Sequence, residues 1–244
     1  MPVVLALETS SPVCSVALRA GDLDDQIRAE AGREHHRKLL PMIEELLTRN
    51  DLKIADIDVI AYGEGPGSFT GLRIGAGVVQ GLAFARRKPV IGISSLQALA
   101  LAVLDAHQGA PDPLVLVAVD AHMNDIYRAV YKAGAGSINC IAEANVVSAD
   151  NGDWLEPYQG RSAIMAGDAW AKFTNLATSL EDAVVSDLIY PDAACVARLA
   201  HERSRDDWRD ASQAQPVYVR GTDQWKTIEQ QRGDSSQRSI AESP

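Results

Sequence analysis

Apolar and polar positions divide the first hundred residues into a regular order of predicted strands and helices. A continuous apolar run at 3–7 predicts a buried strand, and alternation at 14–19 predicts a second strand that turns into a third near 26–30. An amphipathic pattern then predicts a helix over 33–50, with a kink or break near Pro41. The elements predicted after it are a strand at 58–62, a helix at 70–86, a strand at 90–93 and a helix ending near 106.

The pattern starts again after a segment rich in proline and glycine at 108–113. A second apolar strand is predicted at 114–119, and the elements after it are a polar turn at 120–124, strands at 126–131 and near 138, and helices near 168–180 and 192–204. Both halves therefore open with a buried strand, an acidic turn and a meander, which we interpret as a weak internal repeat.

This restart divides the chain into three parts. We predict an N-terminal subdomain over 1–108 that carries the partner or dimer interface, and a smaller C-terminal subdomain over 109–228. The helix at 192–204 is expected to pack back on the first subdomain. The polar residues 229–244 are predicted to form a disordered tail.

Composition limits the classes of function. The 244 residues are 46% hydrophobic, enough for a sizeable core, and carry 23 basic against 33 acidic side chains, for a formal net charge of −10. Such an acidic chain is a poor binder of nucleic acid by itself, because phosphate contacts dominate that affinity. Cys14, Cys140 and Cys195 form no C-x-x-C pair and are interpreted as reduced thiols. With no apolar run long enough to span a membrane and no secretion signal, we expect a cytoplasmic protein that does not contact a membrane.

A glycine-rich stretch at 63–73, with the sequence GEGPGSFTGLR, connects the strand at 58–62 to the helix at 70–86. A strand, a glycine turn and a helix N-terminus form a concavity that favours anions. The stretch is not a phosphate-binding P-loop, because no lysine follows its second glycine at the required spacing. Ser68 is the expected N-cap, and Arg73 near the positive end of the helix suggests an anionic neighbour. The alternative is a tight turn with a solvated arginine.

The helix after this turn contains four glycines at two G-x-x-x-G spacings, Gly71 with Gly75 and Gly77 with Gly81. Each glycine in a helix interior costs about 1 kcal/mol relative to alanine, so four of them need a compensating reason. Glycine lets another backbone approach closely, either inside the chain or at an interface, and the sequence leaves both alternatives open.

Other candidate sites are weaker. Glu8, Thr9 and Ser10 follow the first strand and could hold a metal-bound water or a phosphate, or form an ordinary turn. His35 and His36 are adjacent and point in different directions on a helix. No H-x-x-x-H pair and no G-x-S-x-G motif occurs, so we predict neither a histidine metal site nor a hydrolase triad.

Several of these stretches together resemble the TsaB (YeaZ) family. They are 5–10 (LALETS), 14–18 (CSVAL), 33–35 with 39–41, 62–75 (YGEGPGSFTGLRIG), 120–121, and 216–220 (PVYVR) with Trp225 and Lys226. The resemblance spans residues 3 to about 226, and its central motif is long. It implies an α/β chain with the actin-like ATPase (ASKHA) fold, built from two ribonuclease-H-like subdomains.

The resemblance also implies a function. Members of the family are needed to make threonylcarbamoyladenosine beside the anticodon of tRNAs that read codons starting with A. They act as the non-catalytic, glycoprotease-like paralogue of the transferase TsaD, which they bind and activate together with the ATPase TsaE. The implied partners are TsaD and TsaE, with a homodimer when TsaD is absent and tRNA contacted only through the complex. No cofactor of its own is expected, although ATP or ADP could bind at the interface of the complex.

Two departures from the TsaD pattern accompany this resemblance. Ser95 and Leu99 stand where that pattern has two metal-ligating histidines, and neither side chain can replace imidazole. The glycine-rich nucleotide loop of the second half is reduced to about Gly167 and Asp168. The chain is therefore expected to have no catalytic and no metal-binding residues.

We accordingly predict an interface with TsaD formed by the helices at 33–49 and 70–86. The residues assigned to it are Gly65, Gly67, Ser68, Thr70, Gly71, Arg73, Gly75, His35 and Leu39. Glu8, Thr9 and Ser10 are assigned to a vestigial nucleotide or phosphate groove. The alternatives are a glycoprotease-type metallopeptidase, a sugar-kinase-like phosphotransferase acting alone, and a purely self-associating protein.

Overall fold

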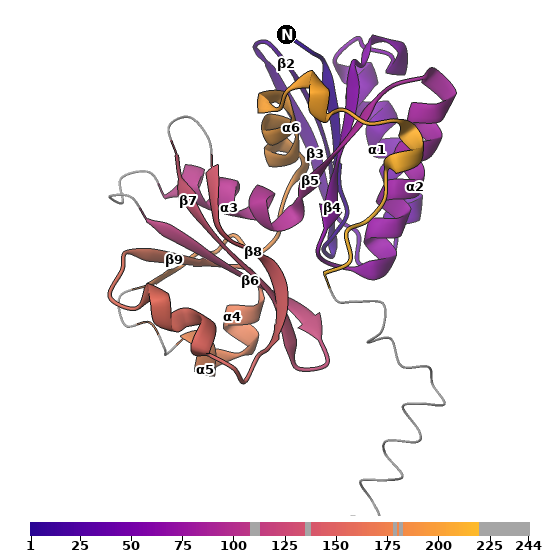
Figure 1. The fold of residues 1–244 in the computed structure, drawn as a ribbon. Coiled ribbons are helices and arrows are strands. Elements are labelled where there is room, and N and C mark those ends of the chain that lie inside the picture. The colour runs from indigo at the N-terminus through magenta and orange to yellow at the C-terminus, as the bar shows by residue number, and fades with distance from the viewer. Residues whose placement is uncertain (108–112, 135–137, 178–179, 181–182, 220–244) are drawn as a thin grey trace, which may run out of the picture.

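The computed structural model describes residues 1–107, 113–134, 138–177, 180 and 183–219. The predicted tail at 229–244, the predicted boundary at 108–112 and Trp225 with Lys226 lie outside the described residues. Helices and two five-stranded sheets make up the described chain (Figure 1), which confirms the predicted α/β fold class. Within the described residues, none of the helices combines the length and the apolar character that a membrane crossing needs.

The first sheet has the strand order β3-β2-β1-β4-β5. Its antiparallel meander is formed by β1 (Val4–Glu8), β2 (Val13–Ala20) and β3 (Leu23–Glu30), while β4 (Val59–Gly65) pairs in parallel with β1 and β5 (Val90–Ser94) with β4. β1 is buried on both faces because Leu5 and Leu7 pack in the core under α1 and α2, while Val4 and Ala6 pack in the core on the opposite face, which explains its continuous apolar sequence.

The second sheet repeats this connectivity. Its strands are β6 (Leu114–His122), β7 (Asp125–Ala133), β8 (Ile138–Ser148), β9 (Ala163–Ala166) and β10 (Val184–Val185). Its order, β8-β7-β6-β9-β10, matches that of the first sheet strand for strand, with the central strand joining a meander to a parallel pair. β9 and β10 were not predicted, because four and two residues are too few to show a pattern.

The helices form three layers around the two sheets. α1 (His35–Arg49) and α2 (Phe69–Arg86) cover one face of the first sheet and contact each other. α3 (Ser95–Ala106) and α6 (Ala193–Glu202) lie between the sheets, where one hydrophobic cluster joins apolar side chains of both sheets to these two helices (Figure 1). The short α4 (Ala169–Lys172) and α5 (Thr174–Ala177) belong to the core on the far side of the second sheet.

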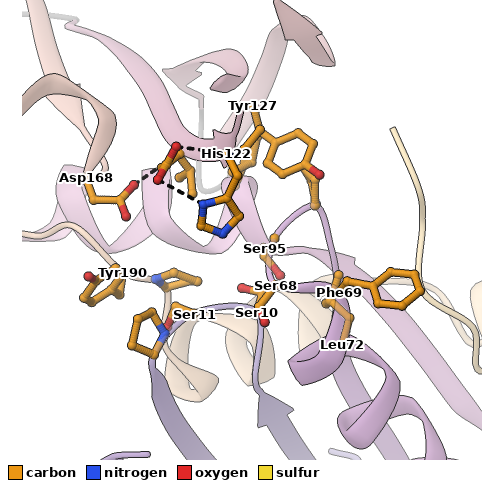
Figure 2. Close-up of a pocket in the computed structure, with 18 of the residues that line it drawn as sticks. Ser10, Ser11, Ser68, Phe69, Leu72, Ser95, His122, Tyr127, Asp168 and Tyr190 are labelled. Carbon is orange, nitrogen blue, oxygen red and sulfur yellow. Dashed lines mark hydrogen bonds and ion pairs between the residues drawn. The ribbon is translucent and has the colours of Figure 1, made fainter. Parts of the chain in front are cut away.

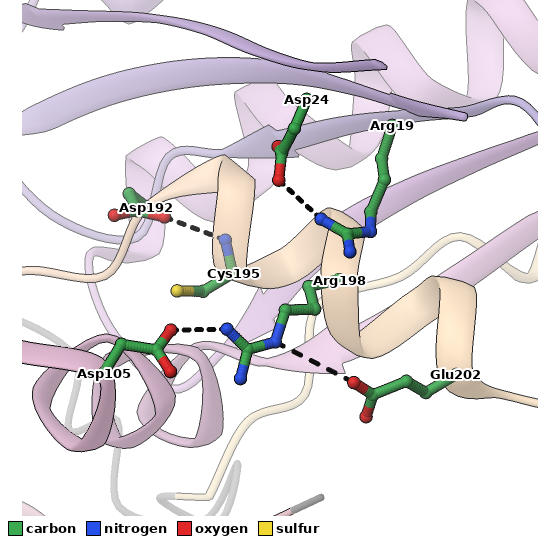
Figure 3. Close-up of polar contacts among 7 residues, drawn as sticks. All are labelled: Arg19, Asp24, Asp105, Asp192, Cys195, Arg198 and Glu202. Carbon is green, nitrogen blue, oxygen red and sulfur yellow. Dashed lines mark hydrogen bonds and ion pairs between the residues drawn. The ribbon is translucent and has the colours of Figure 1, made fainter. Parts of the chain in front are cut away.

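Polar contacts fix α6 in this middle layer (Figure 3). Asp192 caps its N-terminus by accepting from the Cys195 N–H, and Ala193 N–H donates to Ser15 Oγ on β2. Arg198 joins α6 to α3 through an ion pair with Asp105. The helix predicted at 192–204 is thus α6, which packs between strands of the first sheet and α3, far in sequence from both.

Two predicted helices differ from those observed. The helix predicted at 168–180 is instead two single turns separated at Phe173, because the bend lets both Trp170 and Leu176 reach the core. The Trp170 indole N–H donates to the carbonyl oxygens of Leu116 and Ala166, which holds the first turn against β6 and β9. The predicted break near Pro41 does not occur, since α1 continues past this exposed residue to Arg49.

Candidate functional site

A cleft of about 530 Å³ opens between the loops of the two sheets, and we call it the central cleft (Figure 2). Its walls include the turn after β1, the glycine turn with the start of α2, the start of α3, the turn between β6 and β7, Asp168 after β9, the segment that leads into α6, and residues 217–218. The residues that line the cleft include Ser10, Ser68, Phe69, Thr70, Ser95, Asp120, His122, Asp168, Val217 and Tyr218.

The glycine turn is fixed on the turn after β1. Ser68 N–H donates to the Ser10 carbonyl at 2.7 Å, and Ser68 Oγ accepts from Gly71 N–H at 3.3 Å, so Ser68 is the N-cap of α2 as predicted. A Cβ added at Gly67 would lie 2.4 Å from the Ser10 carbonyl oxygen. Gly67, Ser68 and Thr70, which were assigned to a partner interface, thus lie at the cleft rather than on the outer face of the helix.

The four glycines of α2 divide into two pairs with different surroundings. A Cβ at Gly71 would lie 2.0 Å from the Thr9 carbonyl oxygen, and one at Gly75 would lie 2.4 Å from Thr9 Oγ1. Gly77 and Gly81 have open space at the same position. The first pair therefore serves close packing inside the chain, while the second pair leaves a bare strip on the surface of the helix.

Glu8 is a fully buried carboxyl beneath this packing. It accepts from Ser10 N–H at 2.6 Å and from the Ser95 hydroxyl at 2.8 Å. Burial raises the pKa of Glu8 against the lowering effect of these hydrogen bonds. Glu8 and Thr9 are buried away from the cleft, so of the predicted groove residues only Ser10 lines it.

Glu8 should make stability depend on pH. Because its pKa in the folded protein lies above 4.5, the folded state keeps the proton when the unfolded state has lost it. Protonated Glu8 therefore contributes its full stabilisation of the folded state below pH 4.5, and this stabilisation is lost as the pH rises through the folded-state pKa. We expect the stability difference between wild type and Glu8→Gln to shift in favour of the variant as the pH rises above 4.5. Urea unfolding at increasing pH measures the difference, and a pH-independent value would contradict the expectation.

Ser95 and Leu99, the positions at which the resemblance implied two histidines in the TsaD pattern, make contacts inside the chain. Ser95 donates to Glu8, and Leu99 is fully buried in the cluster between the sheets. Within the described ranges, no group of three histidine, cysteine, aspartate or glutamate side chains is arranged to hold a metal ion.

The opposite wall of the cleft carries two carboxylates. Asp168 Oδ1 accepts from Asp120 N–H at 2.9 Å, and Lys172 Nζ lies 2.6 Å from Asp120 Oδ2 (Figure 2 shows the Asp168 contact). Partial desolvation raises the pKa of Asp120, but the hydrogen bonds from Lys172 and the His122 N–H outweigh this effect, so the pKa is lowered. Burial raises the pKa of Asp168. No lysine or arginine is among the described residues that line the cleft. Backbone N–H groups and hydroxyls in these walls can donate hydrogen bonds to a phosphate. The described lining residues provide no lysine or arginine to neutralise its charge.

Two residues assigned to the interface are inside the chain. The His35 ring is buried with Nε2 2.9 Å from the Ser11 carbonyl oxygen, and Leu39 is fully buried against the first sheet. Their side chains therefore cannot form a surface, and this part of the prediction is corrected. The exposed apolar side chain on α1 is the neighbouring Leu40, at 50% exposure.

Arg73 contacts aromatic groups within the chain. Its guanidinium lies 3.8 Å from the centre of the Phe69 ring, and its Nε donates to the Tyr218 hydroxyl at 3.0 Å. The centres of the Phe69 and Tyr218 rings are 5.6 Å apart. A cation over an aromatic face is stabilised without any anion, so the expected anionic neighbour is not needed to explain this residue.

A second hollow lies at the other end of α2, and we call it the α2 groove. It is lined by Gly77, Gln80, Gly81, Phe84, Arg87, Lys88 and residues 208–212, and its volume is about 1340 Å³. Phe84 is 82% exposed beside the two bare glycines. An exposed aromatic ring next to a strip without side chains is an arrangement that favours contact with a partner helix.

Comparisons with known proteins identify related sequences. The model of a family described as TsaD, tRNA N6-adenosine threonylcarbamoyltransferase, matches residues 28–206. The tRNA threonylcarbamoyladenosine biosynthesis protein TsaB of Haemophilus influenzae is 35% identical over 234 residues, covering 92% of this chain and 96% of the relative. The protein of the same name from Escherichia coli is 30% identical, covering 92% and 97%.

A solved structure supports the same relationship. YeaZ from Pseudomonas aeruginosa superposes with a TM-score of 0.81 at 32% sequence identity. The match covers 89% of this chain and all of that one.

Proposed function

This chain belongs to the TsaB (YeaZ) family of tRNA threonylcarbamoyladenosine biosynthesis proteins, and from that premise we propose that it is a non-catalytic subunit that binds and activates a TsaD-type transferase. The modified nucleotide would be the adenosine beside the anticodon of tRNAs that read codons starting with A. The observation that carries the proposal is the outer face of α1 and α2. Leu40 is exposed on α1 and Phe84 is exposed on α2, where Gly77 and Gly81 leave room for another helix.

The geometry favours a helical partner. Bare glycines spaced four apart allow a second helix to approach the backbone of α2, and the Phe84 ring beside them would become buried. α1 and α2 contact each other, so a pair of helices from TsaD, itself related to this chain, could complete a four-helix contact. The same face would allow a homodimer when TsaD is absent.

Charge and cleft chemistry support a subunit that does not act alone. The net charge of −10 disfavours direct binding of tRNA by this chain, so we propose that tRNA is contacted through the complex with TsaD and TsaE. The central cleft presents two carboxylates and no lysine or arginine among its described residues. ATP or ADP is therefore assigned to the assembled complex rather than to this chain.

Reconstitution tests the proposal. The chain is mixed with TsaD and TsaE of the same organism, unmodified tRNA and the threonylcarbamoyl donor, and the nucleosides of the digested tRNA are measured by mass spectrometry. We expect the modified adenosine to form when this chain, TsaD and TsaE are all present. We expect none when this chain is the only protein, and none when this chain is left out. Equal product formation without the chain, or no complex of chain and TsaD by native mass, would reject the proposal.

A further inference from the structure

One segment of the chain forms a wall of both hollows. Residues 208–218, which we call the strap, follow α6 and run along α2 to the glycine turn (Figure 1). Residues 208–212 line the α2 groove, while Val217 and Tyr218 line the central cleft. The groove and the cleft are therefore joined by a continuous stretch of backbone.

The strap is anchored firmly at its groove end. Arg209 and Val90 exchange two backbone hydrogen bonds of 2.9 Å, which adds Arg209 to the edge of β5. The side chains of Ala211 and Ala214 are buried in the core beneath α2. Gln80 Nε2 on α2 donates to the Ala214 carbonyl at 2.8 Å. Gln80 itself lines the groove, so a partner seated there would touch a side chain that holds the strap.

The middle of the strap is held by β4. The Tyr62 hydroxyl accepts from Gln215 N–H at 3.0 Å and donates to the Gln215 carbonyl at 3.2 Å. Val217 N–H donates to the Glu64 carbonyl at 2.7 Å. The Val217 carbonyl oxygen would lie 3.2 Å from a Cβ at Gly65, so the strap lies directly against the glycine turn.

The cleft end is held by one cluster of side chains. Tyr218 packs beside Phe69 and accepts from Arg73 Nε, and both aromatic residues line the cleft. Val217 and Tyr218 are 46% and 40% exposed, so this end has little buried apolar surface. An element with one buried end and one end held by a few exposed polar contacts opens locally with low free energy at the exposed end.

We propose that the strap couples the two hollows, so that a partner seated in the α2 groove changes the position of Val217 and Tyr218 at the central cleft. The identity of that partner rests on the proposed function. The linking contacts run from Gln80 to Ala214, along the backbone to Val217, and from Tyr218 to Arg73 and Phe69. Arg73 acts as a positioning residue, holding the cleft end of the strap on the first turns of α2.

Amide hydrogen exchange on the full chain, without a partner, tests the coupling first. The reporters are the Val217 amide on the strap and the Ser68 amide in the cleft wall, which donates to the Ser10 carbonyl. Gln80→Ala removes the groove-end contact and is expected to speed exchange of Val217 about tenfold and that of Ser68 a few-fold. Tyr218→Phe, which removes only the hydroxyl, should speed the same two amides.

Lys88→Met is the matched control. Lys88 also lines the groove and donates to a backbone carbonyl, that of Ala55 at 2.7 Å, but it does not contact the strap through that bond. We expect it to leave both amides unchanged. The coupling is overturned if Gln80→Ala affects Val217 but not Ser68, if it affects neither, or if Lys88→Met produces the same change.

A second arm adds TsaD to the wild-type chain. Binding with an altered exchange rate at Val217 and Ser68 supports the coupling. Binding without any change at these amides overturns it and leaves the proposed function intact. If TsaD does not bind, the proposed function fails, and the variants measured without a partner still decide whether the strap couples the groove to the cleft.

Discussion

Replacing Gly71 with alanine is expected to lower the free energy of unfolding by about 3 kcal/mol or more. The added Cβ would lie 2.0 Å from the Thr9 carbonyl oxygen, which belongs to a buried turn that cannot withdraw without moving β1. Gly75→Ala should cost less, about 1–2 kcal/mol, because its Cβ meets the Thr9 hydroxyl and that side chain can rotate. Rotation would break the hydrogen bond from Thr9 Oγ1 to the Gly71 carbonyl.

Gly77→Ala and Gly81→Ala are the matched controls on the same helix. Both positions have open space for a Cβ, so each substitution should raise the free energy of unfolding by about 0.5–1 kcal/mol through helix propensity alone. Urea denaturation followed by circular dichroism measures all four variants. Similar changes at Gly71 and Gly77 would show that the close contact with Thr9 does not decide the difference.

Phe84→Asp is expected to weaken binding of TsaD about 100-fold, because a truncated aromatic anchor at the centre of an interface typically loses 2 kcal/mol or more and the new carboxylate would be buried without a partner. Phe84 is the most exposed aromatic side chain in the described part of the α2 groove. Isothermal titration calorimetry with purified TsaD measures the affinity, and sedimentation measures the self-association expected through the same face.

Two controls separate binding from folding in this experiment. Because Phe84 makes little use of the core, the stability of Phe84→Asp should stay within about 0.5 kcal/mol of wild type. Ile141→Asp introduces the same charge at an exposed apolar residue on β8, outside the groove, and should bind TsaD normally. Equal affinity of wild type and Phe84→Asp for TsaD would show that the interface does not include Phe84 on α2.

The sequence predicted the parts of the fold that depend on local pattern. The first meander, α1, α2 and the restart of the pattern at 114–119 follow from apolar periodicity, and Ser68 was identified as a cap from its place before a helix. β9 and β10 were missed because they are too short for a pattern, and the helix at 168–180 was predicted as continuous although the packing of Trp170 and Leu176 divides it.

The candidate site was harder to predict because its contacts are far apart in the sequence. All four glycines of α2 look alike in the chain, and only the position of Thr9 separates Gly71 and Gly75 from Gly77 and Gly81. A leucine at the first pair would therefore test the fold and not the interface. Arg73 was expected to have an anionic neighbour or to be solvated, and its contact with Tyr218 was missed because that residue lies 145 residues away. His35 and Leu39 lie on the apolar face that the periodicity of this helix already indicates, so their burial follows from the sequence pattern, which their assignment to an interface overlooked.

The helix layer between the two sheets makes the halves of the chain interdependent. A fragment ending at residue 107 would contain all five strands of the first sheet but would lack α6, leaving Val4, Ala6 and Ala17 without their cover. A fragment beginning at 113 would likewise lose α3 from beneath the second sheet. Because neither half contains all the residues of its core, the chain should unfold in a single cooperative transition. This holds although its strand order repeats as if two copies of one unit had been joined end to end.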